Sequence, residues 1–297
     1  MLLKYLGMLA ILMLFATVSL AKDAKRPPIT GIAFVRIYAK DPAASRKFYL
    51  ERLRLPEVPC AGTNCAQFQV NKDQYVQIVP AGERNNGMEV VAFRTTDLEA
   101  LRQYLAAHQV KVPGLVVENP DGSREFEIVD AEGHHIAFLQ PGKDNGKRGG
   151  ISHRMIHVGF VVKDRATMDK FYRDVLGFKP YWYGGFQQDH TIWVSSQVPD
   201  GTDWLEYMLD IPADASHHQL GVQNHFSLGT ANINDAVAGL EKSGWTPTPQ
   251  EHTQMGRDGK RQLNVWDPDE VRVEFMEFSP SEKPCCSDFT AEHPKAD

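Results

Sequence analysis

Two histidines and two glutamates occupy matched positions in the second half of the sequence. Glu206 follows His157 at the same interval, 49 residues, at which Glu274 follows His225 (206 − 157 and 274 − 225). Each histidine lies early in a strand-like hydrophobic run, MIHVGFVV or NHFSLGTA, and each glutamate lies late in another, DWLEYML or VRVEFMEF. Equal spacing in equal contexts indicates a duplicated unit that supplies one histidine and one glutamate per copy. Two facing copies would bring four ligands to one divalent metal ion, which favours an enzyme over a binding module.

The alternation of side chains along a strand predicts which way these residues point. His157 should share a face with Gly159, whereas the bulky residues Ile156, Val158 and Phe160 should pack on the helices. The same alternation places the other three candidate ligands on the face away from the helices. A set of histidines and carboxylates without a thiolate suits Fe(II), Mn(II), Ni(II), Co(II) or Zn(II). Because burying two carboxylates without a cation is unfavourable, we expect one divalent ion per chain.

Internal repeats define the elements that must position these ligands. DPAASRKFYLERL begins at Asp41 and DRATMDKFYRDVL at Asp164, and each aspartate stands where a helix N-cap belongs, after a strand-like run. Two more strand-then-helix units begin with MEVVAF and NHFSLG. Three short strands should follow each helix; in the third and fourth units these are residues 178–184, 189–196 and 203–209, and residues 247–252, 261–266 and 271–278. The chain therefore reads as four β-α-β-β-β modules, an α+β fold.

The ends and the middle of the chain differ in composition from the repeats. Lys4 precedes a long uncharged run, and Ser19 and Ala21 fit a signal-peptidase site, so residues 1–21 are predicted to be a signal peptide. The mature chain would be exported, periplasmic or extracellular, without stable membrane insertion; the alternative is an anchor formed by residues 5–21. The Gly-rich, charged segment 143–150 is predicted to link an N-terminal domain, residues 29–142, to a C-terminal one, residues 151–279. Residues 280–297 should form an extended tail.

Composition limits the partners. The chain has 297 residues, enough for two domains, and a formal net charge of −6 with no basic stripe, which argues against nucleic acid. We expect a small-molecule substrate, and the sequence is compatible with a homodimer. If the chain is exported, its four cysteines can form disulfides: Cys60 could pair with Cys65, or either could pair with Cys285 or Cys286. A soft-metal site made of the tail cysteines and His293 is the less favoured alternative.

The four modules, the His and Glu positions and the ending DPDEVRVEFME resemble the vicinal oxygen chelate superfamily. This superfamily includes glyoxalase I, extradiol dioxygenases, methylmalonyl-CoA epimerase and the bleomycin and fosfomycin resistance proteins. The resemblance covers roughly residues 29–278 and is most specific in 151–278. It implies that paired modules form two glyoxalase/bleomycin-resistance/dioxygenase-type barrels, and that the metal lies inside one of them. The residues that match its ligand positions are His157, Glu206, His225 and Glu274.

The first half lacks this ligand set. By alignment from Asp41, the four ligand positions fall on Phe34, Gln77, Val90 and Ala137. By analogy with two-barrel members of the superfamily, the N-terminal barrel should be structural and the C-terminal barrel catalytic. His134 and His135 lie near a predicted turn, DAEGHH, and should be exposed.

The resemblance implies two kinds of chemistry. Glyoxalase I-like enzymes use four protein ligands, and a glutamate beside the metal moves a proton through a metal-stabilised enediolate; Glu206 and Glu274 are the catalytic candidates here. In this reading Glu206→Ala removes activity and weakens metal binding. Extradiol dioxygenases need only a two-histidine, one-carboxylate triad, which His157, His225 and Glu274 could supply. Glu206 then stands where their acid–base histidine is expected.

Other features of the second half bear on these alternatives. Asn264 and Glu270 stand where extradiol dioxygenases have tyrosine and glycine. A non-catalytic small-molecule binder is a third alternative, and the intact ligand set counts against it. We expect the glyoxalase I-like isomerase or lyase chemistry. GRDGKR, residues 256–261, is predicted to be a solvated hairpin, with a basic lid over an anionic substrate as the alternative. The candidate substrate-binding residues are Trp204, Tyr183, Asn264 and Arg272.

Overall fold

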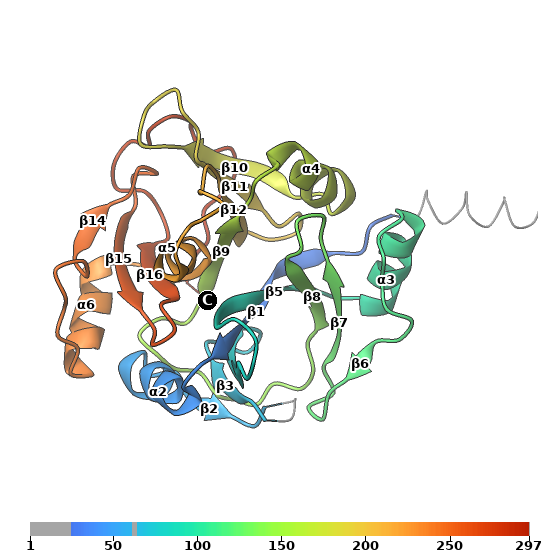
Figure 1. The fold of residues 1–297 in the computed structure, drawn as a ribbon, viewed down its shortest axis with the longest axis horizontal. Coiled ribbons are helices and arrows are strands. Elements are labelled where there is room, and N and C mark those ends of the chain that lie inside the picture. The colour runs from blue at the N-terminus through green and yellow to red at the C-terminus, as the bar shows by residue number, and fades with distance from the viewer. Residues whose placement is uncertain (1–24, 61–63, 297) are drawn as a thin grey trace, which may run out of the picture.

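Two curled eight-stranded sheets lie side by side in the computed structural model, which describes residues 25–60 and 64–296 (Figure 1). The strand order is β2-β3-β4-β1-β5-β8-β7-β6 in the N-terminal sheet and β10-β11-β12-β9-β13-β16-β15-β14 in the C-terminal sheet. The N-terminal strands are β1 (Ile29–Ala39), β2 (Glu57–Val58), β3 (Ala66–Gln69), β4 (Tyr75–Pro80), β5 (Gly87–Thr95), β6 (Val117–Glu118), β7 (Arg124–Val129) and β8 (His135–Gln140). The C-terminal strands are β9 (Met155–Val161), β10 (Lys179–Gly184), β11 (Trp193–Gln197), β12 (Trp204–Met208), β13 (His225–Thr230), β14 (Thr253–Met255), β15 (Arg261–Trp266) and β16 (Arg272–Glu277).

The pairing of these strands confirms the four predicted modules. The first strand of each module runs parallel to the last strand of the same module, as in β1 with β4 and β9 with β12. The first strands of successive modules pair antiparallel at the centre of each sheet, β1 with β5 and β9 with β13. Each sheet is therefore two modules joined at their first strands, which is the predicted α+β architecture of two barrels.

Helices follow the first strand of each module, as predicted. They are α2 (Pro42–Lys47), continued by the π-helix η1 (Phe48–Arg52); α3 (Leu98–Ala107); α4 (Arg165–Asp169), continued by the π-helix η2 (Lys170–Val175); and α6 (Ile233–Lys242). The Asp41 side chain accepts hydrogen bonds from two backbone N–H groups of α2, and Asp164 accepts one from Thr167, so both predicted N-caps are confirmed. A further helix that was not predicted from the sequence, α5 (His217–Gln223), begins at a capping box formed by Ser216 and Gln219.

Two sequence-based predictions about the C-terminal sheet are wrong in detail. Residues 247–252 form a turn instead of a strand, and β14 begins only at Thr253, because Pro247 and Pro249 have no N–H to donate to a neighbouring strand. Ile156 does not pack against the helices; it belongs to a cluster inside the barrel with Trp204. The pairing register of β9 with β13 shifts at this point, so that Met155 takes the core position instead.

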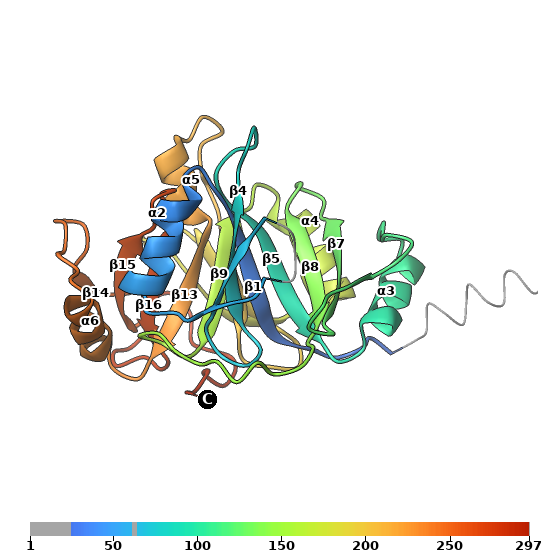
Figure 2. The same cartoon turned by 90° about the horizontal axis from the view of Figure 1, so that it is seen from below.

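The two halves are interlocked through equivalent contacts. The Tyr49 hydroxyl of η1 donates to Asp267, in the turn before β16, over 2.8 Å. The Tyr172 hydroxyl of η2 donates to Asp130, in the turn before β8, over 3.0 Å. The Ser45 hydroxyl of α2 also donates to Asp269 of that turn over 3.0 Å, so α2 lies against the turn between β15 and β16 of the other half (Figure 2). Each half therefore packs one of its helices against the outer surface of the other half.

Burial of one of these carboxyls leads to a pH-dependent prediction. Burial raises the pKa of Asp267 from 3.8 to about 7, against the hydrogen bonds that it accepts. The folded chain then binds this proton more tightly than the unfolded chain, so the contribution to stability is complete below about pH 4 and is lost as the pH rises through 7. The variant Asp267→Asn cannot ionise at this position. As the pH rises from about 4 through 7, the urea midpoint of the wild-type protein should therefore fall relative to that of the variant. Parallel pH profiles of the two proteins would show that Asp267 is not responsible.

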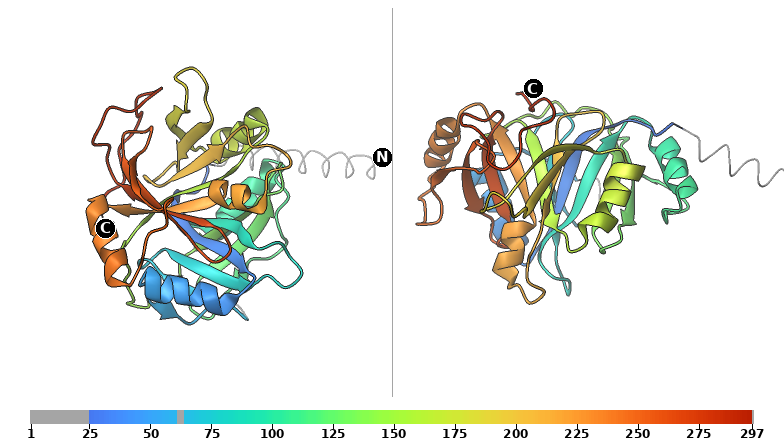
Figure 3. Two further views of the ribbon diagram at one scale, coloured as in Figure 1. Left: turned by 60° about the vertical axis from the view of Figure 1, so that its left-hand side comes forward. Right: turned by 90° about the horizontal axis from the view of Figure 1, so that it is seen from above.

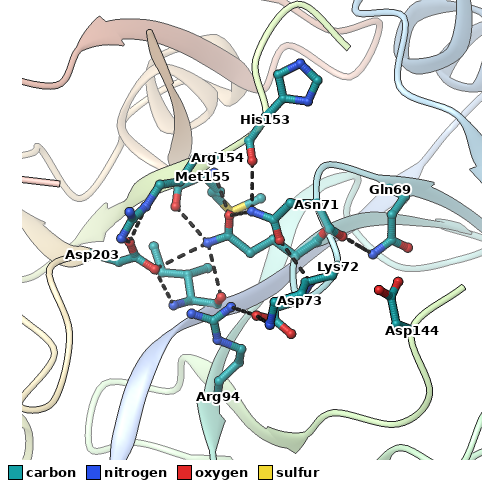
Figure 4. A network of polar contacts seen from close by, with 12 residues as sticks. Gln69, Asn71, Lys72, Asp73, Arg94, Asp144, His153, Arg154, Met155 and Asp203 are labelled. Carbon is teal, nitrogen blue, oxygen red and sulfur yellow. Dashed lines mark hydrogen bonds and ion pairs between the residues drawn. The ribbon is translucent and has the colours of Figure 1, made fainter. Parts of the chain in front are cut away.

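A buried polar network joins the halves at the sheet centres. The Gln74 side chain donates to the backbone oxygen of Met155 and accepts from its N–H, each over 2.8 Å. Asp203 accepts from the Ile32 N–H over 3.0 Å and forms an ion pair with Arg154 over 2.8 Å (Figure 4). Because the Asp203 side chain is 1% exposed, these bonds form in a poorly solvated environment where each polar group depends on its partner.

The cysteines pair locally. Cys60 bonds to Cys65 and Cys285 to its neighbour Cys286, so the predicted alternatives that join the two pairs, or that use the tail cysteines as a soft-metal site, are wrong. In the described part of the chain no helix is both long and apolar enough to cross a membrane. The signal segment 1–21 lies outside the described residues and stays a prediction.

Candidate metal centre

Four neighbouring strands at the middle of the C-terminal sheet carry the predicted ligands. In one row across β9, β13 and β16, His157 is paired with Ser227, and Ser227 with Glu274. In the next row across β12, β9 and β13, Glu206 is paired with Gly159, and Gly159 with His225. The alternation predicted from the sequence thus directs all four side chains to one face.

Gly159 occupies the position where the His225 ring crosses β9. A Cβ atom at residue 159 would collide with Cε1 of His225 and lie 2.7 Å from its Nδ1. The absence of a side chain at this position therefore gives the imidazole its place above the strand.

Three of the four predicted ligands converge. The Nε2 atoms of His157 and His225 lie 3.1 Å apart, and His157 Nε2 lies 3.1 Å from Glu274 Oε2. Their ligand atoms all fall within 4.8 Å of one another, and all three residues are buried. This cluster is the two-histidine, one-carboxylate donor set typical of non-haem iron and manganese sites.

The two histidines are prepared to bind a cation. Nδ1 of His225 lies 2.8 Å from the Gln223 carbonyl oxygen, so it carries the proton and leaves the Nε2 lone pair free. Burial lowers the pKa of His225 well below its ordinary value and also lowers that of His157, which keeps both rings neutral. Burial alone would raise the pKa of Glu274, but the hydrogen bond with His157 and the charge of Arg272 outweigh it, and the pKa is lowered. Two neutral imidazoles facing one carboxylate fit a divalent ion.

Glu206 stands beside this cluster but is not one of its three members. One carboxylate oxygen lies 3.7 Å from Nε2 of His225, and the other accepts a hydrogen bond from the Ser195 hydroxyl over 3.1 Å. Burial, followed by the charge of Glu274, raises its pKa to about 8. A carboxyl group in this place can carry a proton next to a bound ion, or join the ion as a fourth ligand.

The equivalent face of the N-terminal sheet is filled by other side chains. Phe34 stacks on Tyr75 with ring centroids 4.9 Å apart, and Arg36 lies where the C-terminal half has Gly159. The Arg36 guanidinium bonds to the Gln77 side chain and forms an ion pair with Glu127 over 3.1 Å. These residues occupy the space that the ligands occupy in the other half.

The prediction that His134 is exposed is wrong, because its side chain is largely buried. Its ring nitrogens lie 2.9 Å from the Asp130 carboxylate and 2.9 Å from the Val161 carbonyl oxygen, so it bridges β8 and β9 at the junction of the halves. His135 is half-exposed and pairs with Glu127 over 2.6 Å. Within the described residues, neither is part of the cluster of ligand atoms.

Two connected cavities lead to the cluster. An inner cavity of about 90 Å³ is bordered by Glu206 and Glu274 and by aromatic rings, among them Trp204. An outer cleft of about 730 Å³ opens beside it, with walls that include Trp193, Met255 and Trp266. Trp193, Arg257 and Arg272 are among the residues that line both. The site therefore has a narrow, partly polar end and a wide, largely apolar approach.

The C-terminal segment closes one wall of the inner cavity. It crosses over the strands of the C-terminal half (Figure 3). The N–H of Cys285 donates to Arg257, before β15, and the N–H of Thr290 donates to Tyr181 on β10, so the segment connects the two edges of the curled sheet. Phe289 lines the cavity between these points. The composition of residues 280–297 predicts an extended tail but contains no signal for its place beside the cavity.

Lys260 contacts two residues that line the inner cavity, Trp204 and Phe289. The segment 256–261 is not wholly a solvated hairpin, because Lys260 is fully buried. Its ammonium lies 4.4 Å from the ring centroid of Trp204 and 5.2 Å from that of Phe289, cation–π contacts that partly replace water. Burial lowers the pKa of Lys260 to about 8. Trp204 in turn stacks on His157, with ring centroids 4.7 Å apart.

The predicted substrate residues divide into two groups. Trp204 lines the inner cavity, Asn264 the outer cleft, and Arg272 both. Tyr183 lines neither and is 49% exposed, and its part in substrate binding stays a prediction. A register shift in β10 turns Tyr181 and Trp182 together toward the interior and leaves the next residue outside.

Comparison with known proteins agrees with this geometry. Residues 154–275 match the model of the Glyoxalase/Bleomycin resistance protein/Dioxygenase superfamily. The C-terminal half is a domain of this superfamily. No curated protein sequence is significantly similar to the chain.

Solved structures of the superfamily share the fold of both halves. A variant of homoprotocatechuate 2,3-dioxygenase from Brevibacterium fuscum aligns with a TM-score of 0.68 at 16% identity, over 90% of this chain and 75% of the other. The Mn(II)-bound glyoxalase from Novosphingobium aromaticivorans aligns with a TM-score of 0.66 at 20% identity, over 84% and 83%. Members of the superfamily are generally metal-dependent enzymes, and the His157, His225 and Glu274 cluster makes a divalent metal site the fitting assignment here.

Proposed function

We propose that this protein is a divalent-metal-dependent enzyme that moves a proton on a substrate binding the ion through adjacent oxygens. The observation that carries the proposal is the position of Glu206, 3.7 Å from a ligand nitrogen and outside the three-residue cluster. The Ser195 hydroxyl holds one of its oxygens. A carboxyl group fixed beside the substrate site is suited to general acid–base catalysis.

Each residue of the site has a part in this reaction. His157, His225 and Glu274 would hold the ion, which when bound stabilises negative charge that develops on substrate oxygens. Glu206 takes a proton from the substrate and returns it at a neighbouring atom. Trp204 fixes the plane of the His157 ring by stacking on it. This is isomerase or lyase chemistry of the glyoxalase type, and the likeness to a glyoxalase with bound Mn(II) supports it.

A second candidate is ring cleavage of a catechol-type substrate with oxygen. It is favoured by the composition of the cluster, because two histidines and one carboxylate leave coordination positions for both substrates. The structural likeness to an extradiol dioxygenase supports it as well. Glu206 would then serve as the acid–base group of that reaction.

Two assays distinguish the candidates. Protein loaded with Mn(II), Fe(II), Zn(II), Ni(II) or Co(II) would be tested for isomerisation of hemithioacetals without oxygen, and for cleavage of catechols with oxygen. Proton-transfer chemistry requires turnover in the absence of oxygen. Turnover that depends strictly on oxygen consumption would favour the second candidate, and no turnover in either assay with metal-loaded protein would count against both.

Replacing Glu206 separates its catalytic role from a structural one. We expect Glu206→Gln to lower kcat by at least about 100-fold, the effect typical of a lost acid–base group, and to retain the metal, because the three-residue cluster is intact. Glu241→Gln, on the exposed side of α6, is the matched control and should change neither quantity. Loss of metal from Glu206→Gln, measured by elemental analysis, would instead make Glu206 a fourth ligand.

A further inference from the structure

Arg272 is a largely buried cation that has no hydrogen-bond acceptor among the described residues. Its side chain is 12% exposed, and its Nε is fully buried without a partner among the described residues. Its nearest carboxylate is Glu274, with Nη1 3.8 Å from Oε1, too far for a hydrogen bond. A guanidinium carries five N–H donors; leaving the buried Nε donor unsatisfied is unfavourable, and no hydrogen bond joins the Nη donors to the described residues. An acceptor supplied from outside the chain would resolve this.

The surroundings of Arg272 place that acceptor in the substrate site. Arg272 lines the inner cavity beside Glu206 and Glu274, and it also lines the outer cleft. The residue paired with it on β15 is Trp266, whose indole N–H is likewise buried without a partner. Two unsatisfied donors on neighbouring strands thus belong to residues that line the outer cleft, and one of these residues, Arg272, also lines the inner cavity.

The alternative that Arg272 only orients Glu274 does not account for its position. A residue that orients a carboxylate does so through short, directional hydrogen bonds, and the 3.8 Å contact is not one. Once Glu274 shares its charge with a metal ion, the attraction between Glu274 and Arg272 weakens further. The other arginine that borders both cavities, Arg257, is already engaged by the Gly185 carbonyl oxygen and by Cys285 Sγ.

We propose that Arg272 is the anchor for an anionic group of the substrate, a carboxylate bound by its guanidinium at the junction of the two cavities. The planar guanidinium matches a planar carboxylate and can hold both of its oxygens. The substrate is then an anion that carries adjacent chelating oxygens at one end and an apolar or aromatic body that fits the outer cleft, between Trp193, Met255 and Trp266. This inference rests on the proposed function for the chelating end only.

The test compares two probes that differ in charge. Binding of 3,4-dihydroxybenzoate and of its neutral amide, 3,4-dihydroxybenzamide, would be measured without oxygen through the fluorescence of the tryptophans that line the cavities. Wild-type protein should bind the benzoate roughly 10-fold or more tightly than the amide, the effect expected of a charge-assisted hydrogen-bonded pair. In Arg272→Gln this ratio should fall to about 1, and in Arg272→Lys, which keeps the charge, it should be intermediate.

The controls separate this inference from the proposed function. Arg261→Gln changes an exposed arginine of β15 that lines neither cavity and should keep the wild-type ratio. Metal content is measured for every variant, and both probes are also titrated into metal-free protein. A ratio near 1 in metal-loaded wild-type protein, or no binding of the benzoate, overturns the anchor and leaves the metal site standing. A ratio that depends on Arg272 in protein that takes up no metal supports the anchor and overturns the proposed function.

Discussion

His225→Ala is expected to abolish metal binding at the C-terminal site. The ring supplies one of three converging ligand atoms, and its Nε2 lies 3.1 Å from that of His157. Loss of a residue that merely supports a ligand typically weakens metal affinity 10–100-fold, so loss of a ligand should weaken it by more than about 100-fold. Elemental analysis after dialysis, followed by titration with Mn(II) and Zn(II), would measure the change.

An exposed histidine provides the control for this substitution. His252→Ala removes the same side chain from a surface turn and should leave one equivalent of metal bound. Circular dichroism would establish that both variants are folded. If His225→Ala still retained a full equivalent of tightly held metal, the assigned ligand cluster would be wrong.

Asp203→Ala is expected to reduce the free energy of unfolding by about 3–5 kcal/mol, the loss typical when one partner of a buried ion pair is removed. Asp203 bonds to the backbone of β1 in the other half and to Arg154, and its side chain is almost fully buried. Removing the carboxylate leaves the Ile32 N–H and part of the Arg154 guanidinium without their acceptor. Urea denaturation at constant pH would give the change from the midpoint and slope.

A surface aspartate separates the effect of burial from that of charge. Asp189→Ala alters an exposed position of the C-terminal half and should change stability by less than about 0.5 kcal/mol. A loss for Asp203→Ala no larger than this would mean that water replaces the carboxylate at the junction of the halves. The network in Figure 4 would then have little effect on stability.

The periodicity of hydrophobic residues along the sequence predicted most of the fold and the face of the sheet on which the candidate ligands lie. The alternation in MIHVGFVV and DWLEYML predicted the side of the sheet on which His157 and Glu206 lie, because a strand repeats every two residues. The same rule failed at Ile156, since the pairing register of β9 with β13 shifts there. Such irregularities depend on which strand pairs with which, and a single strand contains no signal for them.

Features formed by distant parts of the chain could also not be predicted from the sequence. Lys260 is buried because Phe289, from the C-terminal segment, and Trp204, from another strand, cover it; nothing next to it in the sequence indicates this. Glu206 matched the ligand pattern as well as Glu274 did, and only the distances distinguish a carboxylate within the cluster from one beside it. The pairing of Cys285 with Cys286 was not among the alternatives that the sequence suggested.

The reciprocal tyrosine hydrogen bonds between the two halves have a consequence for assembly. Tyr49 of the N-terminal half donates to Asp267 of the C-terminal half, and Tyr172 of the C-terminal half donates to Asp130 of the N-terminal half. These reciprocal contacts within one chain have the pattern of an isologous dimer interface. In a dimer of separate subunits such contacts would depend on protein concentration, whereas a covalently attached partner is always present at high local concentration. Dilution would therefore not dissociate the unit that contains the His157, His225 and Glu274 cluster. The N-terminal half therefore takes the place of a second subunit that is always attached. This structural role does not require metal ligands in the N-terminal half.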